Sequence, residues 1–152
     1  MSDVDATRDS GEFVTAICAE VTTWPAVSDG DHRDGGREFY LGTTEIGHVH
    51  RSGLVDVQYR LQLRDAVIAD GLTAPHTLAP RSGWTSFRIT DAGDVDNALT
   101  LLRISYIDTL LVRSHTHICR AALDELDVDD EFDALPKLTR TELEGLYSEL
   151  LA

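Results

Sequence analysis

Apolar residues at helical spacing mark the first element of the chain. Four of them fall on one face of a helix: Phe13, Ile17, Val21 and Trp24. Pro25 follows directly and ends this helix. The preceding residues 1–10 include three aspartates, and we expect them to form a disordered acidic leader.

Short runs with strand character come next. Residues 28–36 are rich in Gly, Asp and Ser, which favour turns, so we expect a loop there. Strands are predicted at residues 37–42, 44–50 and 54–59, with short breaks at Gly42 and around Gly53. Breaks this short permit only a reversal of direction, so the three strands should form an antiparallel meander.

The pattern continues with a short helix near Leu63, which Gly71 stops, and two strands at residues 75–79 and 84–90. An amphipathic helix from Asp94 to Leu111 should cover the sheet. The order α-β-β-β-α-β-β-α predicts an α+β fold, with an antiparallel sheet of about five strands and helices on one face. This order is similar to that of type III secretion chaperones and YjbR-like proteins.

The last part of the chain has a different character. We assign residues 11–111 to the α+β domain and residues 112–152 to a C-terminal helical extension. Ile118, Ala122 and Leu126 indicate one helix, residues 127–133 an acidic joint, and Thr139 with Glu142 the capping box of a last helix. We expect these helices to pack against the domain rather than to bind a partner helix.

The charge excludes several kinds of partner. The 152 residues include 27 acidic and 13 basic ones, a net charge of -14, and Lys137 is the only lysine. Such a field repels phosphates and anionic lipids, so we expect no nucleic acid and no membrane partner. Abundant carboxylates with almost no lysine are typical of salt-adapted proteins, which favours a halophilic source.

Two further features bear on location and redox state. There is no apolar run of about 18 residues and no signal-peptide pattern at the start, so we expect a cytoplasmic protein. Cys18 and Cys119 are far apart in the sequence, and we expect both to be reduced packing residues. The oligomeric state is not predicted.

Candidate chemistry concentrates in residues 45–50. On a strand, His48 and His50 point to one face about 7 Å apart, so their imidazoles can converge on a metal or a substrate. Glu45 would point to the other face unless Gly47 marks a β-bulge. His76 precedes another predicted strand and can approach the same place. The alternative is that these are exposed strand residues that water or aspartate satisfies.

Two residues outside this segment also have two interpretations. Trp84, directly after a tight turn, would wall a pocket or cap the core. Arg64 would bind a substrate carboxylate or phenolate, or form a surface ion pair. The sequence has no glycine-rich phosphate loop and no CxxC pair, which removes support for nucleotide-binding and zinc-finger functions.

Many ordered segments together resemble the luciferase-domain family, which is named after fungal luciferases. The segments include residues 22–27, 36–39, 45–50, 63–65, 82–87 and 101–106, with Asp56, Gly71 and His76 between them. The resemblance spans about residues 13–110, and the acidic composition indicates a haloarchaeal member. It implies oxidation of a hydroxylated ring compound by dioxygen without a separate organic cofactor.

These observations lead to one main expectation and two alternatives. We expect a small-molecule-binding enzyme with oxygenase-like chemistry, no cofactor, and dioxygen as a possible co-substrate. His48, His50 and Glu45 would be catalytic. Four residues would bind the substrate: Asp56, Arg64, His76 and Trp84. The alternatives are a protein-interaction module and a metalloenzyme that uses His48, His50 and His76.

Overall fold

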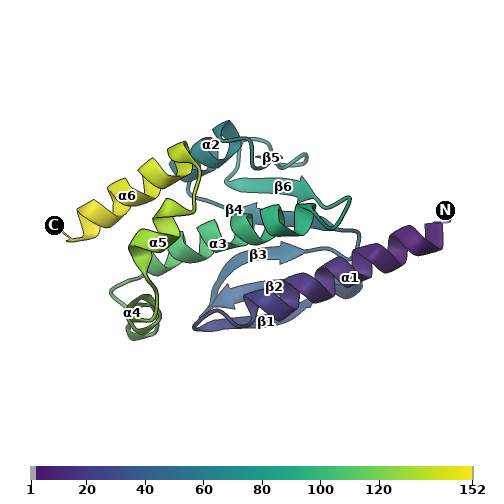
Figure 1. Cartoon of the computed structure of the whole chain (residues 1–152), viewed down its shortest axis with the longest axis horizontal. Coiled ribbons are helices and arrows are strands. Elements are labelled where there is room, and N and C mark those ends of the chain that lie inside the picture. Colours follow the sequence, from purple (N-terminus) through teal and green to yellow (C-terminus); the bar gives the residue numbers. More distant parts are fainter. Residues whose placement is uncertain (1–2, 152) are drawn as a thin grey trace.

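A computed structural model describes residues 3–151 and has the α+β fold that the pattern predicts (Figure 1). In this part of the chain, six strands form one antiparallel sheet in the order β1-β2-β3-β4-β6-β5. The strands are β1 (Val27–His32), β2 (Gly36–Leu41), β3 (Thr44–Val49), β4 (Leu54–Gln58), β5 (Ala74–Pro75) and β6 (Trp84–Arg88). The helices are α1 (Asp3–Val21), α2 (Leu61–Ala69), α3 (Asp94–Val112), α4 (His117–Asp124), α5 (Val128–Asp133) and α6 (Lys137–Leu151), with a 3-10 turn, η1, at Arg33–Gly35.

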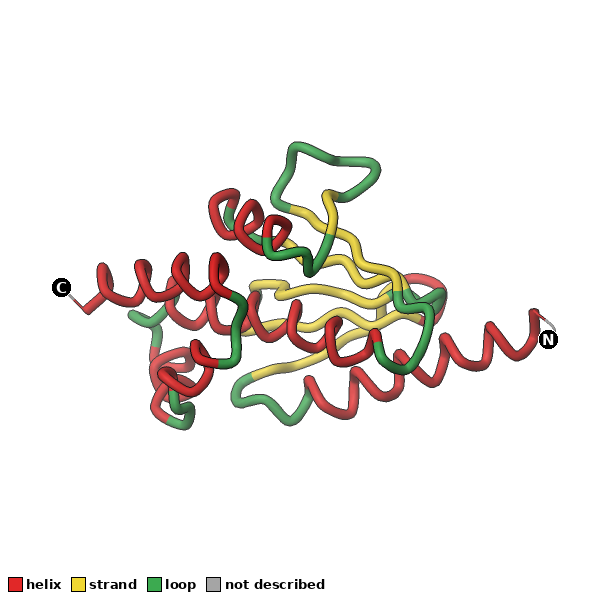
Figure 2. Tube along the Cα trace, turned by 45° about the horizontal axis from the view of Figure 1, so that its top comes forward, coloured by secondary structure: helices red, strands yellow, loops and turns green. Residues whose placement is uncertain are grey.

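Helices α1 and α3 cross the same face of the sheet, and the two ends of the chain lie at opposite ends of the molecule (Figure 2). Alternate strand residues point at these helices, and several are almost fully buried: Phe39, Ile46, Val49, Val55 and Val57. Each such side chain contributes about 1.5–3 kcal/mol when it leaves water. The core therefore uses one face of the sheet and leaves the other face to polar side chains.

The predicted loop at residues 28–36 is wrong, because most of it is β1. This edge strand pairs with β2 along its whole length, from Val27 opposite Leu41 to His32 opposite Gly36. Arg37 on β2 forms ion pairs with Asp29, at 2.5 Å, and with Asp31. These pairs offset the poor strand propensity of the acidic residues and bring the sheet to six strands.

The strands predicted at residues 37–42, 44–50 and 54–59 are confirmed, as is the one that begins at Trp84. The strand predicted at 75–79 is wrong beyond Pro75. There the chain turns, and the backbone N–H of Ala79 donates to the carbonyl of His76 at 3.2 Å.

The N-terminal helix is longer than predicted. It begins at Asp3, so residues 3–10 are helical where we expected a disordered leader, and residues 1 and 2 lie outside the described part. Between Asp3 and Ser10 no proline or glycine interrupts the helix. No helix of residues 3–151 is long and apolar enough to cross a bilayer.

The C-terminal helices pack on the rest of the chain, with α6 along α2 and Leu143 buried. The predicted acidic joint is wrong, because it contains α5, whose N-terminus is capped by the side chain of Asp127. The capping box at Thr139 is also wrong, since α6 begins two residues earlier and Thr139 binds Asp70 instead. Both cysteines are free thiols, as predicted.

Candidate functional site

A row of polar side chains crosses the sheet on the face opposite α1 and α3, which we call the polar face. The strand register places Glu38 on β2 opposite His48 on β3, His48 opposite Asp56 on β4, and Asp56 opposite Ser86 on β6. Side chains directly opposite one another on neighbouring strands have Cβ atoms about 5 Å apart. The row therefore brings four polar residues from four strands into mutual reach.

A β-bulge in β3 adds Glu45 to this row. Phe39 lies opposite Gly47 but Tyr40 lies opposite Glu45, so Ile46 is the extra residue. As a result, Glu45 points to the same side as His48, and its Oε2 lies 2.8 Å from His48 Nδ1. From the sequence, Glu45 reaches this side only if β3 has a bulge at Gly47, and the structure has that bulge.

Asp56 is the centre of the polar face, and its side chain is only 4% exposed. Its Oδ2 lies 2.8 Å from His50 Nε2, 3.1 Å from His48 Nε2 and 3.8 Å from His76 Nε2. Its Oδ1 accepts a hydrogen bond from the Ser86 hydroxyl at 2.7 Å. One buried carboxylate thus holds the imidazoles of His48 and His50, lies near that of His76, and has a partner for each oxygen.

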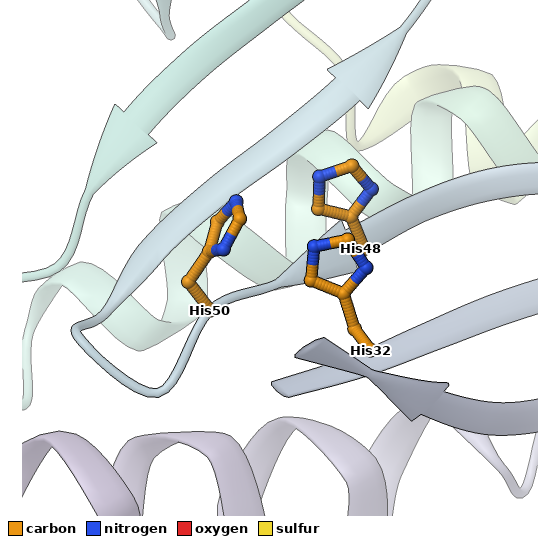
Figure 3. Close-up of side chains that lie close together, drawn as sticks. All are labelled: His32, His48 and His50. Carbon is orange, nitrogen blue, oxygen red and sulfur yellow. The ribbon is translucent and has the colours of Figure 1, made fainter. Parts of the chain in front are cut away.

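His32, the last residue of β1, completes what we call the imidazole cluster, namely His32, His48 and His50 (Figure 3). Its ring stacks on that of His48, with centroids 4.2 Å apart, and meets the edge of His50 at 4.8 Å. Its Nδ1 lies 2.7 Å from Glu38 Oε1. Among the described residues, its buried Nε2 has no hydrogen-bond partner.

The electrostatics of the polar face follow from these contacts. Burial lowers the pKa of His48, but hydrogen bonds to Asp56 and Glu45 outweigh it and raise the pKa from 6.5 to about 9. Burial raises the pKa of Asp56, yet its bonds to His48, Ser86 and His50 hold that pKa well below the ordinary value. The bond between Glu38 and His32 likewise lowers the pKa of Glu38. Asp56 and Glu38 are therefore ionised, and they place negative charge beside the imidazoles.

The structure gathers most of the residues that the sequence suggested. Glu45, His48, His50 and Asp56 are in direct contact, as described above. Trp84 packs beside His48 with ring centroids 5.2 Å apart. Arg64 is placed elsewhere, since it pairs with Asp65 at 2.8 Å and donates to the carbonyls of Pro80 and Ser82.

Two residues of the site were not found from the sequence. His32 was assigned to a turn, because the edge strand that carries it reads as a polar loop. Glu38 had a usable signal, since it alternates with buried Phe39 and so points to the polar face. If the pairing of Glu38 with His48 had been predicted along with the strands, Glu38 would have been placed beside the histidines.

A cleft of about 310 Å³ lies next to the site, where β3 and β4 diverge. Its lining comes from both strands and from the end of α3: Thr44, Glu45, Gln58, Tyr59, Arg60, Asp108, Thr109, Val112 and Arg113. Arg60 forms a bidentate pair with Asp108 on one wall. Glu45 belongs both to this cleft and to the contact with His48, so the cleft adjoins the polar face at that residue.

The comparisons with known proteins identify one family. Residues 43–105 match the model of a family described as Luciferase domain. The match runs from β3 into α3 and contains His48, His50 and Asp56, whereas His32 and Glu38 precede it. No curated protein and no solved structure matched the chain.

Proposed function

We propose that this chain, whose residues 43–105 match the luciferase-domain family, is an oxidoreductase. Its substrate would be a small phenolic or enolisable molecule, and dioxygen would be the co-substrate. The observation that carries the proposal is the contact of 2.8 Å between Asp56 Oδ2 and His50 Nε2. A buried carboxylate that holds an imidazole in this way is an arrangement suited to proton transfer.

His50 is the proposed proton acceptor. If its Nε2–H donates to Asp56, the lone pair resides on Nδ1, and that nitrogen can accept a proton from the substrate. The side chain of His50 is 27% exposed, whereas that of His48 is 12% exposed, so His50 is the more accessible of the two. His48 uses both ring nitrogens on Glu45 and Asp56, so it keeps the Asp56 carboxylate in position for His50.

The proposed reaction conserves every atom. His50 removes a proton from the substrate hydroxyl or from the carbon beside its carbonyl, which leaves an electron-rich anion. That anion donates two electrons to dioxygen and forms one carbon–oxygen bond, so the product is a peroxide anion. The proton held by His50 then returns to the peroxide, and the net change is addition of O₂ to give a hydroperoxide.

The neighbouring surface suits a ring compound. Trp84 presents an aromatic ring beside His48, and flat molecules stack on such rings. His76 lies near Asp56, at 3.8 Å, and adds a polar group to the same edge. The cleft of about 310 Å³ that reaches Glu45 is at the lower end of the size range of small-ligand sites, and it touches the polar face only through Glu45.

Oxygen consumption with 4-hydroxy-6-methyl-2-pyrone and a set of substituted phenols tests the proposal. With a compound that is turned over, His50→Gln should lower kcat by about 10²–10⁴-fold, because it removes the general base. His117→Gln changes an exposed histidine on α4 and serves as the matched control. A His50→Gln rate equal to that of the unaltered protein would rule out this role for His50.

A further inference from the structure

We propose that His32, His48 and His50 bind one divalent transition-metal ion, with Asp56 as the fourth ligand. The three imidazoles come from the end of β1, from the last residue but one of β3 and from the residue that follows β3 (Figure 3). One ligand nitrogen from each lies within 4.8 Å of the others. Ligand atoms around a tetrahedral ion with bonds of about 2.0–2.1 Å lie about 3.4 Å apart, so small side-chain rotations suffice.

The orientation of two rings supports this assignment. His32 and His48 both turn Nδ1 to a carboxylate, at 2.7 Å from Glu38 and 2.8 Å from Glu45. A carboxylate that accepts from Nδ1–H leaves Nε2 as the nitrogen for the metal, and at His48 the ion would displace the proton that faces Asp56. This pairing of carboxylate and histidine is the usual outer shell of histidine ligands, and here it occurs twice, at His32 on β1 and at His48 on β3.

The buried Nε2 of His32 is the second, independent observation. It has no hydrogen-bond partner among the described residues, and the stacked ring of His48 lies directly beside it. A buried polar atom without a partner costs about 1–3 kcal/mol. Coordination of an ion by this nitrogen removes that cost, whereas neither Glu38 nor His48 satisfies the atom in the metal-free arrangement.

Asp56 supplies both an oxygen ligand and charge. Its Oδ2 already lies within 3.1 Å of His48 Nε2 and 2.8 Å of His50 Nε2, while Ser86 occupies its other oxygen. With neutral imidazoles, the three carboxylates of Glu38, Glu45 and Asp56 give the site a negative charge that favours a cation. The ion would take the place of the proton that His48 shares with Asp56.

The ligand set limits the kind of metal. Three imidazoles and one carboxylate are borderline ligands that suit Zn²⁺, Fe²⁺, Co²⁺ or Cu²⁺ and disfavour Mg²⁺ and Ca²⁺, which prefer oxygen. Neither thiol belongs to the cluster, because Cys18 and Cys119 lie on helices α1 and α4. The sequence suggested His76 as the third histidine ligand, whereas the residue that lies with His48 and His50 is His32.

This inference rests on the same site as the proposed function and extends it. A bound divalent ion lowers the pKa of a hydroxyl that binds to it. In the metal-bound form, deprotonation of the substrate would depend on the ion, and His50 would act as a ligand. The overall oxidation by dioxygen would stay the same.

Metal binding is measured on the full-length chain without any substrate, so the result does not depend on activity. The purified protein is treated with a chelator and dialysed, then titrated with Zn²⁺ by calorimetry and with Co²⁺ by visible absorption. We expect one ion per chain, and Co²⁺ bands typical of four or five ligands. Absence of binding by both ions would overturn the metal site, whatever the oxygen assay gives.

Two substitutions distinguish the proposed ligands from their neighbours. His32→Phe keeps an aromatic ring against His48 and removes the nitrogens, and we expect the affinity to fall at least about 10–100-fold. Glu38→Gln should weaken binding by a similar factor through His32 without removing a ligand. His76→Gln is the matched control and should bind as the unaltered protein does. Retained affinity in His32→Phe with loss in His76→Gln would overturn the assignment, and circular dichroism of each variant verifies folding.

Discussion

The carboxylate of Asp70 accepts hydrogen bonds from both the backbone N–H and the hydroxyl of Thr139, each at 2.7 Å. It also accepts a bond from the N–H of Leu138 at 3.2 Å. Asp70 directly follows α2, and the two donors lie in the first turn of α6. A residue from 69 positions earlier in the chain thus caps the last helix and fixes the C-terminal helices to the α+β domain.

Removal of this carboxylate should destabilise the protein. We expect Asp70→Ala to lower the free energy of unfolding by about 0.5–2 kcal/mol, as loss of an N-cap does. Asp70→Asn keeps one oxygen acceptor and should lose less. Urea denaturation followed by circular dichroism measures both values. Equal stability of Asp70→Ala and the unaltered protein would show that the cap contributes nothing.

The same cap predicts a dependence on pH. Burial raises the pKa of Asp70, but bonds from Thr139 and Leu138 outweigh it and lower the pKa below 3.8. The folded state therefore binds the proton less readily than the unfolded state, so the contribution is complete above about pH 5 and is lost as the pH falls through the folded pKa. The stability difference between the unaltered protein and Asp70→Asn should shrink below about pH 4. A difference that stays constant down to pH 2 would contradict this.

Gly47 predicts a coupling between the bulge and the core. Its φ is +156°, and an added Cβ would lie 2.6 Å from Leu102 Cδ2 and 3.2 Å from the carbonyl oxygen of Asp56. We expect Gly47→Ala to lower the free energy of unfolding by about 1–3 kcal/mol, because the buried Leu102 side chain must leave its position and the Asp56 carbonyl is crowded. Gly42→Ala, where φ is +61° and no atom lies within 4 Å, measures the cost of backbone strain without a clash. A loss no larger in Gly47→Ala than in Gly42→Ala would exclude the steric effect.

The sequence predicted those elements whose apolar pattern is strong. Strands β2, β3 and β4 alternate between core and polar face, and α3 carries a continuous apolar stripe, so local pattern and final fold agree. Strand β1 was missed because Ser28, Asp29, Gly30 and Asp31 all disfavour strands in isolation. Pairing with β2 and the ion pairs to Arg37 decide its structure, and both are tertiary contacts that no local pattern contains.

The candidate site was predictable to a similar degree. Spacing alone placed His48 and His50 on one face, and the structure confirms that both contact Asp56. His32 was out of reach, since its place beside His48 depends on two strand registers and on an edge strand that reads as a loop. Glu45 points to the polar face only because β3 contains a bulge. Gly47 makes such a bulge possible, but a glycine alone does not predict that one forms.

The charge of the chain leads to the last prediction. The net charge is -14, so the carboxylates of the chain repel one another in dilute buffer. On α5 this repulsion is visible locally, because the charge of the nearby Asp127 raises the pKa of Asp130. In molar salt the Debye length falls to about 3 Å and this repulsion is screened. The free energy of unfolding should therefore rise between about 0.1 and 2 M KCl. Asp130→Asn removes one of the repelling charges, so it should raise stability at low salt and make little difference at high salt. Greatest stability at the lowest salt concentration, or an Asp130→Asn effect independent of salt, would show that the carboxylates are no adaptation to a saline environment.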